Sequence, residues 1–414
     1  MKNNHIPEIR FAGFTGDWGQ KPLTELVERV TRKNKKGESR LPLTISAQYG
    51  LVDQETYFNK TVASTNLEGY YLLYKGEFAY NKSYSNGYPY GAIKRLEKHD
   101  KGVLSSLYIC FRPLNYSVSS DFLTHYFESA VWHKEVSMIS VEGARNHGLL
   151  NISVSDFFET LHLIPNLVEQ TKIGNFLKQL NDTIVLHQQE LTILKQTKQG
   201  FLQKMFPKEG ESVPEVRFSG FTADWEQRTL GEMSESFEYG LNASATEYDG
   251  ENKYIRITDI DDNTHEFLEE NLTSPNIDLS SADNYLVKEG DILFARTGAS
   301  VGKSYIYDKK DGKVYYAGFL IRARIKSGYD PGFIFQNTLT SKYSKFIKVT
   351  SQRSGQPGVN AQEYANFSLM APNNDEQIKI GNFFKQIDDT IALHQRELNI
   401  LKETKKAFLQ KMFA

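Results

Sequence analysis

The chain has 414 residues, which is too long for one ordinary domain and enough for two or three domains with their own cores. Its composition, 39% hydrophobic and 24% charged, is that of a globular protein and excludes collagen-like and wholly disordered chains. The formal net charge is −2, so binding to nucleic acid would need local basic patches.

A single cysteine, Cys110, excludes an internal disulfide bond and a cysteine-rich zinc site, and it points to a reducing compartment. No apolar run approaches the roughly 18 residues of a membrane span, and the first residues lack the apolar core of a signal peptide. We therefore expect a cytoplasmic protein with no membrane segment.

The chain begins with one copy of an internal repeat. The segment PEIRFAGFTGDWGQKPLTEL starts at Pro7 and PEVRFSGFTADWEQRTLGEM starts at Pro214, with 12 of 20 positions identical. We call these two segments the leading motifs. A second pair of segments, each of 42 residues, starts at Pro165 and Pro372, with 30 positions identical and no gap. Both offsets are 207, half the chain length, so the chain is a tandem duplication.

Region one, about residues 11–163, has diverged almost completely from its counterpart. Strand-like runs such as YLLYKGEFAY and GVLSSLYICF, turn residues and a helix expected near 121–135 indicate an α+β domain. Only a faint echo of the repeat remains, between KGEFAY at Lys75 and EGDILFAR at Glu289, now 214 residues apart.

Basic and aromatic side chains of region one are candidates for contacts with nucleic acid. A basic cluster lies between Arg29 and Arg40, and the segment 145–151 offers arginine and asparagine. Solvated surface charge is the alternative for each single side chain. The candidate DNA-binding residues of region one are Lys82, Tyr84, Lys94, Arg95, Arg145 and Asn146.

The pattern from Pro165 to Phe206 predicts one long helix, and residues 372–414 repeat it. Asn166 and Glu169 have the N-cap and N3 spacing of a capping box, and no proline interrupts the segment. Apolar residues recur at alternating spacings of three and four, which is typical of a coiled-coil seam. The predicted seam residues are Leu177, Leu180, Ile184, His187, Leu191, Leu194, Phe201, Phe384, Ile387, Ile391, His394, Leu398, Leu401 and Phe408.

A helix of about 40 residues with one narrow apolar stripe is not stable alone, and the other copy is its obvious partner. The linker 207–213 reaches at most about 25 Å, so the second variable region starts near the end of the first long helix. Antiparallel pairing fits this connection, whereas parallel pairing would require the chain to run back along the whole helix. We predict antiparallel helices with the two variable regions at opposite ends; the alternative is an ordinary helix pair inside a larger bundle. We expect His187 and His394 to set the register as packed polar residues rather than to bind a metal.

Region two, about residues 218–370, has the same α+β character, with strand-like runs GDILFAR and FLIRARI and a helix expected near 331–347. Thirteen acidic residues lie between Glu247 and Asp291, and an excess of lysine and arginine follows. Such uneven charge is typical of a nucleic-acid footprint, with solvated surface charge as the alternative.

Two loops of region two carry side chains of the types that pair with guanine and adenine edges. Residues 295–304 offer arginine, threonine, serine and lysine on a glycine-containing turn, and residues 352–360 offer glutamine, arginine and asparagine. A tight structural turn is the alternative for each loop. The candidate DNA-binding residues of region two are Arg296, Thr297, Ser300, Lys303, Arg322, Arg324, Gln352, Arg353, Ser354, Gln356 and Asn360.

The predicted fold class is α+β. We predict two globular domains, residues 1–164 and 207–371, separated by two long antiparallel coiled-coil helices, residues 165–206 and 372–414, in an internal tandem repeat with pseudo-twofold symmetry. Catalytic motifs are missing: the stretch from Gly298 is one residue short of a phosphate-binding loop, and no group of residues has convincing metal spacing. We therefore predict a protein that is not an enzyme and has no metal site.

Two motifs carry a resemblance that covers the whole chain. P-E-[IV]-R-F-x-G-F-T-x-D-W precedes each variable region, and E-Q-x-K-I-G-N-F begins each long helix. With this order of parts the chain resembles the specificity subunit of a type I restriction-modification enzyme. The resemblance implies two target recognition domains that read a bipartite, asymmetric DNA target, and helices that act as spacers and set the gap.

The resemblance also implies partners. These are double-stranded DNA, two DNA adenine methyltransferase subunits and two restriction (motor-nuclease) subunits. S-adenosylmethionine, ATP and Mg²⁺ would belong to those partners, and this chain would bind no cofactor. The alternative function is a non-catalytic coiled-coil scaffold that spaces two protein-binding modules.

Overall fold

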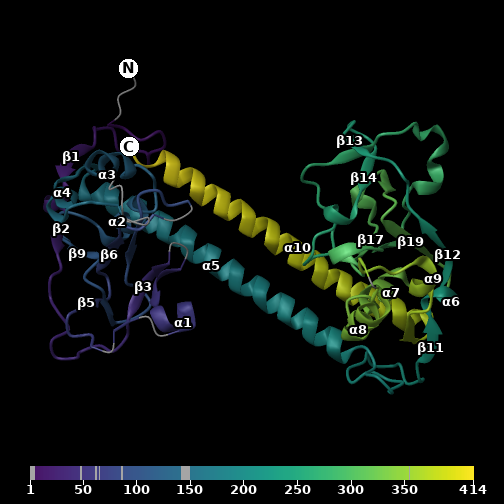
Figure 1. The fold of residues 1–414 in the computed structure, drawn as a ribbon. Helices are drawn as coiled ribbons and strands as arrows, with labels where there is room; N and C mark the ends of the chain where they lie inside the picture. Colours follow the sequence, from purple (N-terminus) through teal and green to yellow (C-terminus); the bar gives the residue numbers. More distant parts are fainter. Residues whose placement is uncertain are drawn as a thin grey trace. The chain divides into compact units, whose positions relative to one another are not determined.

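The computed structural model describes residues 5–46, 49–60, 63–64, 66–84, 87–140, 150–353 and 355–414. The chain divides into two units, each with one variable region and part of both long helices (Figure 1). Unit 1 is Met1–Leu186 with Leu398–Ala414, and unit 2 is His187–Glu397. We call residues 19–164 head 1 and residues 226–371 head 2. In the described part of the chain, no helix combines the length and the apolarity that crossing a membrane requires.

Head 1 mixes short strands and short helices. Its strands are β1 Gly19–Pro22, β2 Val27–Arg29, β3 Leu43–Ser46, β4 Gly50–Asp53, β5 Tyr71–Tyr74, β6 Phe78–Asn81, β7 Ala92–Arg95, β8 Lys101–Leu104, β9 Ile109–Pro113 and β10 Leu161–Ile164. Its helices are η1 Leu23–Glu25, α1 Gln54–Phe58, α2 Ser120–Tyr126, α3 His133–Ile139 and α4 Val154–Glu159.

Head 2 also mixes short strands and short helices. Its strands are β11 Glu226–Thr229, β12 Ser234–Tyr239, β13 Ala245–Glu247, β14 Lys253–Ile255, β15 Thr273–Pro275, β16 Asp291–Ala295, β17 Ser304–Ile306, β18 Val314–Tyr316, β19 Leu320–Ile325 and β20 Ser368–Ala371. Its helices are α6 Leu230–Met233, η2 Ile257–Asp259, η3 Leu279–Ser281, η4 Asp283–Tyr285, η5 Gly298–Ser300, η6 Lys309–Asp311, α7 Pro331–Asn337, α8 Ser341–Thr350 and α9 Ala361–Ala365.

The two heads share the topology of the main sheet and the pairing of their first and last strands, although their sequences differ. The main sheet has the strand order β2-β9-β6-β7 in head 1 and β12-β19-β16-β17 in head 2. The first and last strands of each head pair antiparallel, β1 with β10 and β11 with β20, so each head returns to the point where its chain entered. The α+β prediction is therefore confirmed, and the duplication extends through the variable regions.

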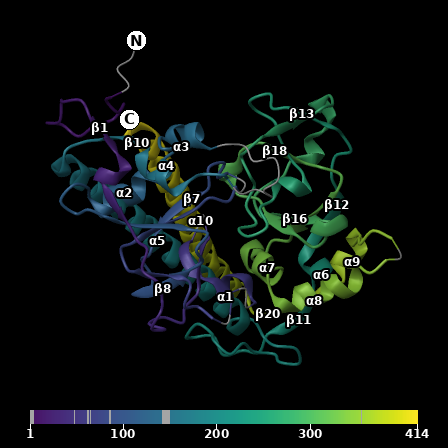
Figure 2. The same ribbon diagram turned by 60° about the vertical axis from the view of Figure 1, so that its left-hand side comes forward.

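Each helical stretch predicted from the sequence is divided into two shorter helices. The stretch near 121–135 contains α2 and the start of α3, and the stretch near 331–347 contains α7 and most of α8. The breaks coincide with new N-caps, for example at Thr340, whose hydroxyl accepts from the backbone N–H of Tyr343 at 3.4 Å. In Figure 2, α7 lies next to the sheet of head 2, where Phe333 shares an apolar core with Phe294 of β16.

The two long helices are α5, Leu167–Lys204, and α10, Asn374–Lys411, with 38 residues each, or about 57 Å at 1.5 Å per residue. In unit 1 the start of α5 packs on the end of α10, with the rings of Phe176 and Phe408 5.0 Å apart. In unit 2 the end of α5 packs on the start of α10, with the rings of Phe201 and Phe383 also 5.0 Å apart. In both units residue numbers fall along α10 as they rise along α5, so the helices are antiparallel.

Polar residues of the seam pair across the helices at positions related by the repeat. Lys405 donates to Asn181 Oδ1 at 2.9 Å in unit 1, and Lys198 lies 2.6 Å from Asp388 Oδ1 in unit 2. All the predicted seam residues are buried or half-buried. These matched polar pairs fix the register, because a shift by one heptad would leave each lysine half-buried without its partner.

The leading motif and the start of each long helix are joined by a buried ion pair. Arg10 donates from Nε and Nη2 to both carboxylate oxygens of Glu169 at 2.6 and 2.7 Å, and Arg217 does the same to Glu376. Both glutamates are fully buried. The capping-box prediction is therefore only half right: Asn166 accepts the N–H of Glu169 at 3.0 Å, but the carboxylate turns to arginine, a stronger, charge-assisted partner.

The glutamine after each of these glutamates connects the long helix to its head. Gln170 accepts from the backbone N–H of Ser119, the N-cap of α2, at 2.9 Å. Gln377 accepts from the backbone N–H of Asp330, the N-cap of α7, at 3.1 Å. Both glutamines are buried. The shared motif E-Q-x-K-I-G-N-F is therefore the joint between helix and head.

The leading motif also reaches the end of the other long helix. In unit 1 the N–H of Ile9 donates to the carbonyl of Lys411 at 2.9 Å, and in unit 2 the N–H of Val216 donates to the carbonyl of Lys204 at 2.9 Å. These bonds satisfy carbonyls that a helix end leaves unpaired. The leading motif thus holds the start of one long helix and the end of the other.

The end of each long helix completes the apolar core of a head. Met412 and Phe413 are buried in unit 1, where the ring of Phe413 lies 5.5 Å from that of Phe122. Phe206 is its counterpart in unit 2 and lies 5.6 Å from Phe333. The sequence pattern predicted one long helix up to these residues and did not show that they belong to the cores of the heads.

Gly381→Ala is expected to destabilise unit 2 by about 1–3 kcal/mol, because a Cβ would overpack the joint. That Cβ would lie 2.1 Å from Asp330 Oδ1, which caps α7. Gly200→Ala is the matched control, since a Cβ there meets nothing within 4 Å and the second copy has Ala407 at this position. It should stabilise by up to about 1 kcal/mol. Urea unfolding of the full-length variants measures both changes, and equal effects would contradict the close approach at Gly381.

Candidate nucleic-acid interface

In each four-stranded main sheet, the inner strand β6 or β16, which we call the central strand, is followed directly by a basic residue. Strand β6 is followed by Lys82 and strand β16 by Arg296, which are 214 residues apart. This is the offset of the faint echo seen in the sequence, so the two side chains occupy equivalent positions in the heads. The turns before these strands match as well, since Gly76 and Gly290 both have positive φ, 89° and 85°.

The two loops predicted from the sequence of region two lie side by side. The N–H of Gly298 donates to the carbonyl of Pro357 at 3.0 Å, and the N–H of Val359 donates to the carbonyl of Arg296 at 2.9 Å. Head 1 has the equivalent bond, from the N–H of Leu150 to the carbonyl of Lys82 at 2.9 Å. Both heads therefore bring a second loop to the end of the central strand.

Arg296 is held between two exposed aromatic rings. Its guanidinium carbon lies 5.1 Å from the ring centre of Tyr239 and 6.0 Å from that of Phe319, and these rings are 44% and 57% exposed. Among the described residues no carboxylate pairs with this guanidinium. The three side chains line a hollow of about 600 Å³ on head 2. An arginine oriented by ring contacts and free of an acid is available to an external acceptor.

Sequence reasoning missed Tyr239 and Phe319. Their signal was an aromatic residue next to glycine, Tyr239-Gly240 and Gly318-Phe319. The pattern is weak, because the exposure of an aromatic ring depends on strands β12 and β19, which are distant in the sequence and pair in the sheet.

The described residues of the 352–360 loop include both exposed side chains and side chains with partners. Gln352 and Gln356 are exposed. Arg353 is engaged by Glu363 at 2.5 Å and by the carbonyls of Thr350 and Gln352. Asn360 accepts the N–H of Glu363 at 2.9 Å as the N-cap of α9, so the structural alternative applies to its side chain.

Three of the candidate basic residues of head 2 turn inward. Arg322 is buried and pairs with Glu238 and, at 3.8 Å, with Asp291. Arg324 donates to both carboxylate oxygens of Asp291 at 3.0 and 2.9 Å. Lys303 pairs with Asp262 and donates to the carbonyl of Ile260 at 3.0 Å. These side chains hold the sheet and its loops together, and we do not place them in the interface.

The uneven charge of region two has a structural explanation. Its acidic stretch and its basic stretch fold onto one another and form ion pairs within head 2. These pairs are Lys303–Asp262, Lys309–Glu289, Lys310–Glu266, Lys313–Glu251 and Arg324–Asp291. The local excess of positive charge therefore does not by itself mark a nucleic-acid footprint.

The remaining candidates have mixed surroundings. Thr297 donates to the carbonyl of Pro357 at 3.5 Å, and the side chain of Ser300 is half-buried in the same turn. Arg145, Asn146 and Ser354 lie outside the described residues.

In head 1 the side chain of Lys82 donates to the carbonyl of Ile152 at 3.1 Å, and Tyr84 is 61% exposed. Arg95 pairs with Glu97 and Asp121. Burial lowers the pKa of Lys94, an effect that the nearby charge of Glu128 opposes. Arg95 and Lys94 thus contribute to the packing of head 1, while Lys82 and Tyr84 lie at the end of the central strand.

Comparisons with known proteins identify the family. Residues 222–403 match the family model of the type I restriction modification DNA specificity domain. The first half of the chain repeats the main-sheet topology of the matched half. The second half of the chain thus contains a type I restriction modification DNA specificity domain.

Relatives and solved structures agree with this family. The chain is 23% identical over 209 residues to the putative type I restriction enzyme MjaX specificity subunit of Methanocaldococcus jannaschii, a match that covers 49% of this chain and 48% of that protein. It is 22% identical over 274 residues to the MjaVIII specificity subunit of the same organism, covering 61% of each. The matches thus span about half to three fifths of these relatives.

A solved structure shows the same fold over the whole chain. The S subunit of the type I restriction-modification system from M. genitalium has a TM-score of 0.64 at 15% identity, and the match covers 99% of both chains. At this identity the likeness concerns the fold of the specificity subunit and leaves the DNA contacts of this chain to be argued from its own residues.

Proposed function

We propose that this specificity subunit reads a bipartite, asymmetric DNA target with its two heads. The observation that carries the proposal is the placement of Lys82 and Arg296 at the same point of one topology, on heads whose sequences otherwise differ. The same main sheet carries lysine in head 1 and arginine in head 2 at the end of its central strand. Two heads that differ in this side chain suit a target whose two parts differ in sequence. The antiparallel helices act as the spacer that sets the gap between them.

The chemistry at the end of β16 supports DNA as the ligand. Arginine pairs bidentately with the O6 and N7 of guanine, and glutamine pairs with the N6 and N7 of adenine. Arg296 and the exposed Gln352 and Gln356 supply these groups on adjoining loops. The aromatic rings beside Arg296 pre-orient its guanidinium and lower the entropy cost of making such contacts.

Partner subunits are part of the proposal. Leu186 and Ile193 of α5 are exposed, and so are their repeat counterparts Leu393 and Ile400 of α10. Exposed apolar side chains at repeat-related positions suit two copies of one partner, which we propose to be DNA adenine methyltransferase subunits. Two motor-nuclease subunits would complete the assembly. S-adenosylmethionine, ATP and Mg²⁺ would be bound by these partners, and this chain would be non-catalytic.

Arg296→Ala tests the reading role. We expect it to weaken binding to the cognate target by about 1–3 kcal/mol and to relax specificity at one base position. Lys348→Ala, which removes an exposed cation of α8, is the control and should have a small effect that is the same for every sequence. Binding is measured by competition with DNA variants, using the full-length chain in complex with its methyltransferase. No loss with Arg296→Ala would remove this residue from the interface.

The scaffold alternative is tested by salt in the same assay. Phosphate contacts release counterions, so affinity for DNA should fall steeply between 50 and 200 mM salt, with a slope of about −0.9 per phosphate contacted. A scaffold for protein-binding modules would show no specific DNA binding and no such slope.

A further inference from the structure

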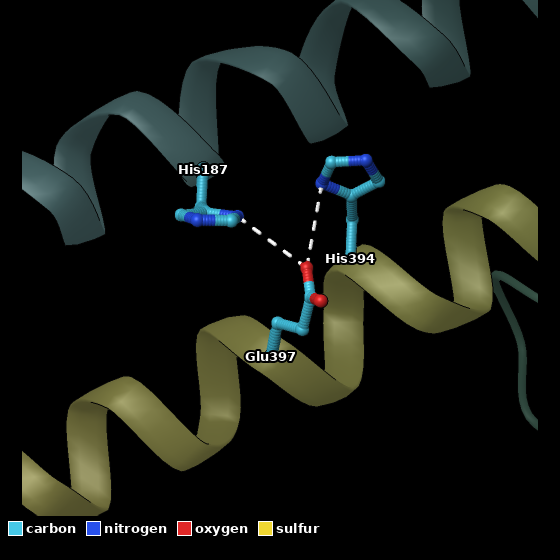
Figure 3. Close-up of side chains that lie close together, drawn as sticks. All are labelled: His187, His394 and Glu397. Carbon is cyan, nitrogen blue, oxygen red and sulfur yellow. Dashed lines mark ion pairs between the residues drawn. The ribbon is translucent and has the colours of Figure 1, made fainter.

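Two histidines face each other where α5 and α10 cross in unit 2. His187 of α5 and His394 of α10 are repeat counterparts, and their ring centres lie 5.7 Å apart (Figure 3). Each is followed three residues later by a glutamate, Glu190 and Glu397, so the imidazole and the carboxylate lie on one face of each helix. The four side chains form a cluster that we call the His–Glu cluster.

The His–Glu cluster has nearly symmetric geometry. His187 Nδ1 lies 3.7 Å from Glu397 Oε2, and His394 Nδ1 lies 3.7 Å from Glu190 Oε2 on the opposite helix. The distances within each helix are 3.9 Å for His187–Glu190 and 4.0 Å for His394–Glu397. None of these contacts is short enough to be a hydrogen bond.

Both Nδ1 atoms are buried and have no hydrogen-bond partner among the described residues. A buried polar atom without a partner is costly, and it calls for an explanation when it recurs at two repeat-related positions. Packed polar residues that only set the register, as expected from the sequence, would be satisfied by one another. The two imidazoles are not: their Nδ1 atoms are directed at carboxylates that stay beyond bonding distance.

We infer that the His–Glu cluster binds a divalent transition metal of the Zn²⁺ type, through the Nδ1 atoms of His187 and His394 and the carboxylate of Glu397. The ligand atoms of these three residues all lie within 4.8 Å of one another. Tetrahedral zinc with bonds of about 2.0–2.1 Å places its ligands about 3.3–3.5 Å apart. The imidazole–carboxylate distances of 3.7 and 4.0 Å would therefore shorten by about 0.2–0.7 Å, and no pair of ligand atoms by more than about 1.5 Å. Glu190 Oε2 lies beside both imidazoles, 3.9 Å from His187 Nδ1 and 3.7 Å from His394 Nδ1.

The ligand types select the metal. Imidazole nitrogen with carboxylate oxygen suits Zn²⁺ and its neighbours, whereas Mg²⁺ and Ca²⁺ prefer sites made of oxygen alone. Two carboxylates also balance the charge of a divalent ion beside two neutral imidazoles. The bound ion would clamp α5 to α10 at this register, because both helices supply ligands.

The test is zinc binding by the full-length chain. After treatment with EDTA and dialysis, zinc is titrated in competition with a chromogenic chelator, and thermal unfolding is recorded with and without zinc. We expect one Zn²⁺ per chain and a higher Tm with zinc. His187→Gln with His394→Gln should weaken binding at least about a hundredfold and abolish the rise in Tm. His99→Gln, a histidine of head 1, is the control and should keep both.

A second variant keeps the test decisive if the histidine variant fails to fold. Glu190→Gln with Glu397→Gln retains both imidazoles and should weaken zinc binding at least about tenfold, since a carboxylate ligand is lost. Four-coordinate Co²⁺ bound in place of zinc should give intense visible absorption that both variants lose. Absence of stoichiometric zinc, or binding that neither variant changes, would overturn the inference and leave the histidines as polar register residues.

Discussion

Glu376→Gln is expected to destabilise unit 2 by about 3–5 kcal/mol, the typical cost of breaking a buried ion pair. Glu376 is fully buried and accepts two hydrogen bonds from Arg217, whose side chain is 14% exposed. Glutamine offers one acceptor and turns an amide group toward the guanidinium, so a buried cation loses its partner. Urea unfolding followed by hydrogen exchange in β11 and β20 would locate the loss in head 2.

Two controls show whether the loss of stability comes from leaving a buried charge without its partner. Glu209→Gln removes an exposed ion pair with Lys345 and should change the free energy of unfolding by less than about 1 kcal/mol. Replacing both partners, Arg217→Met with Glu376→Leu, should recover most of the lost stability, because no charge is left buried. A cost below about 1 kcal/mol for Glu376→Gln would show that the pair does not hold the joint between helix and head.

Four residues inserted after Thr192 are expected to abolish sequence-specific binding. They advance the rest of α5 by about 6 Å and rotate it by about 40°, so Lys198 and Phe201 leave Asp388 and Phe383. The seam can tolerate whole heptads only. DNA binding and the Tm of the variant measure the loss.

Seven residues inserted in both helices are the matched variant. The register of neighbouring contacts places Ala392 opposite Thr192, so heptads after each would pair with one another and leave the His–Glu cluster intact. They lengthen the pair by about 10 Å, or about three base pairs at 3.4 Å per step. We expect a fully folded protein whose target has a longer gap. An unaltered gap in an active protein would contradict the spacer role of the helices.

The long helices could be predicted because the residues that specify them lie close together in the sequence. Apolar spacing and the absence of proline indicated the seam, and the duplication supplied the partner. The partner of the Glu169 side chain was predicted wrongly because that partner is distant in the sequence. Its spacing from Asn166 fits a capping box, but its partner Arg10 lies 159 residues away, and no local pattern shows that the leading motif folds back there.

The candidate interface was harder to predict because basic residues serve two purposes. Arg322 and Arg296 come from equally basic segments, yet one is tied to Glu238, 84 residues away, and the other lies between two rings. Only the pairing of distant strands decides which arginine is free. The echo at offset 214 was the sequence signal that aligned Lys82 with Arg296.

The methylated motif in cells that express the chain with its methyltransferase shows whether the two heads read the target. With the wild-type chain we predict adenine methylation at a target of two unlike parts with a fixed gap. Exchanging residues 11–163 for the corresponding region of another specificity subunit should change one part and leave the other part and the gap intact. A motif that survives deletion of the chain, or that changes in both parts after this exchange, would show that the two heads do not each read one part.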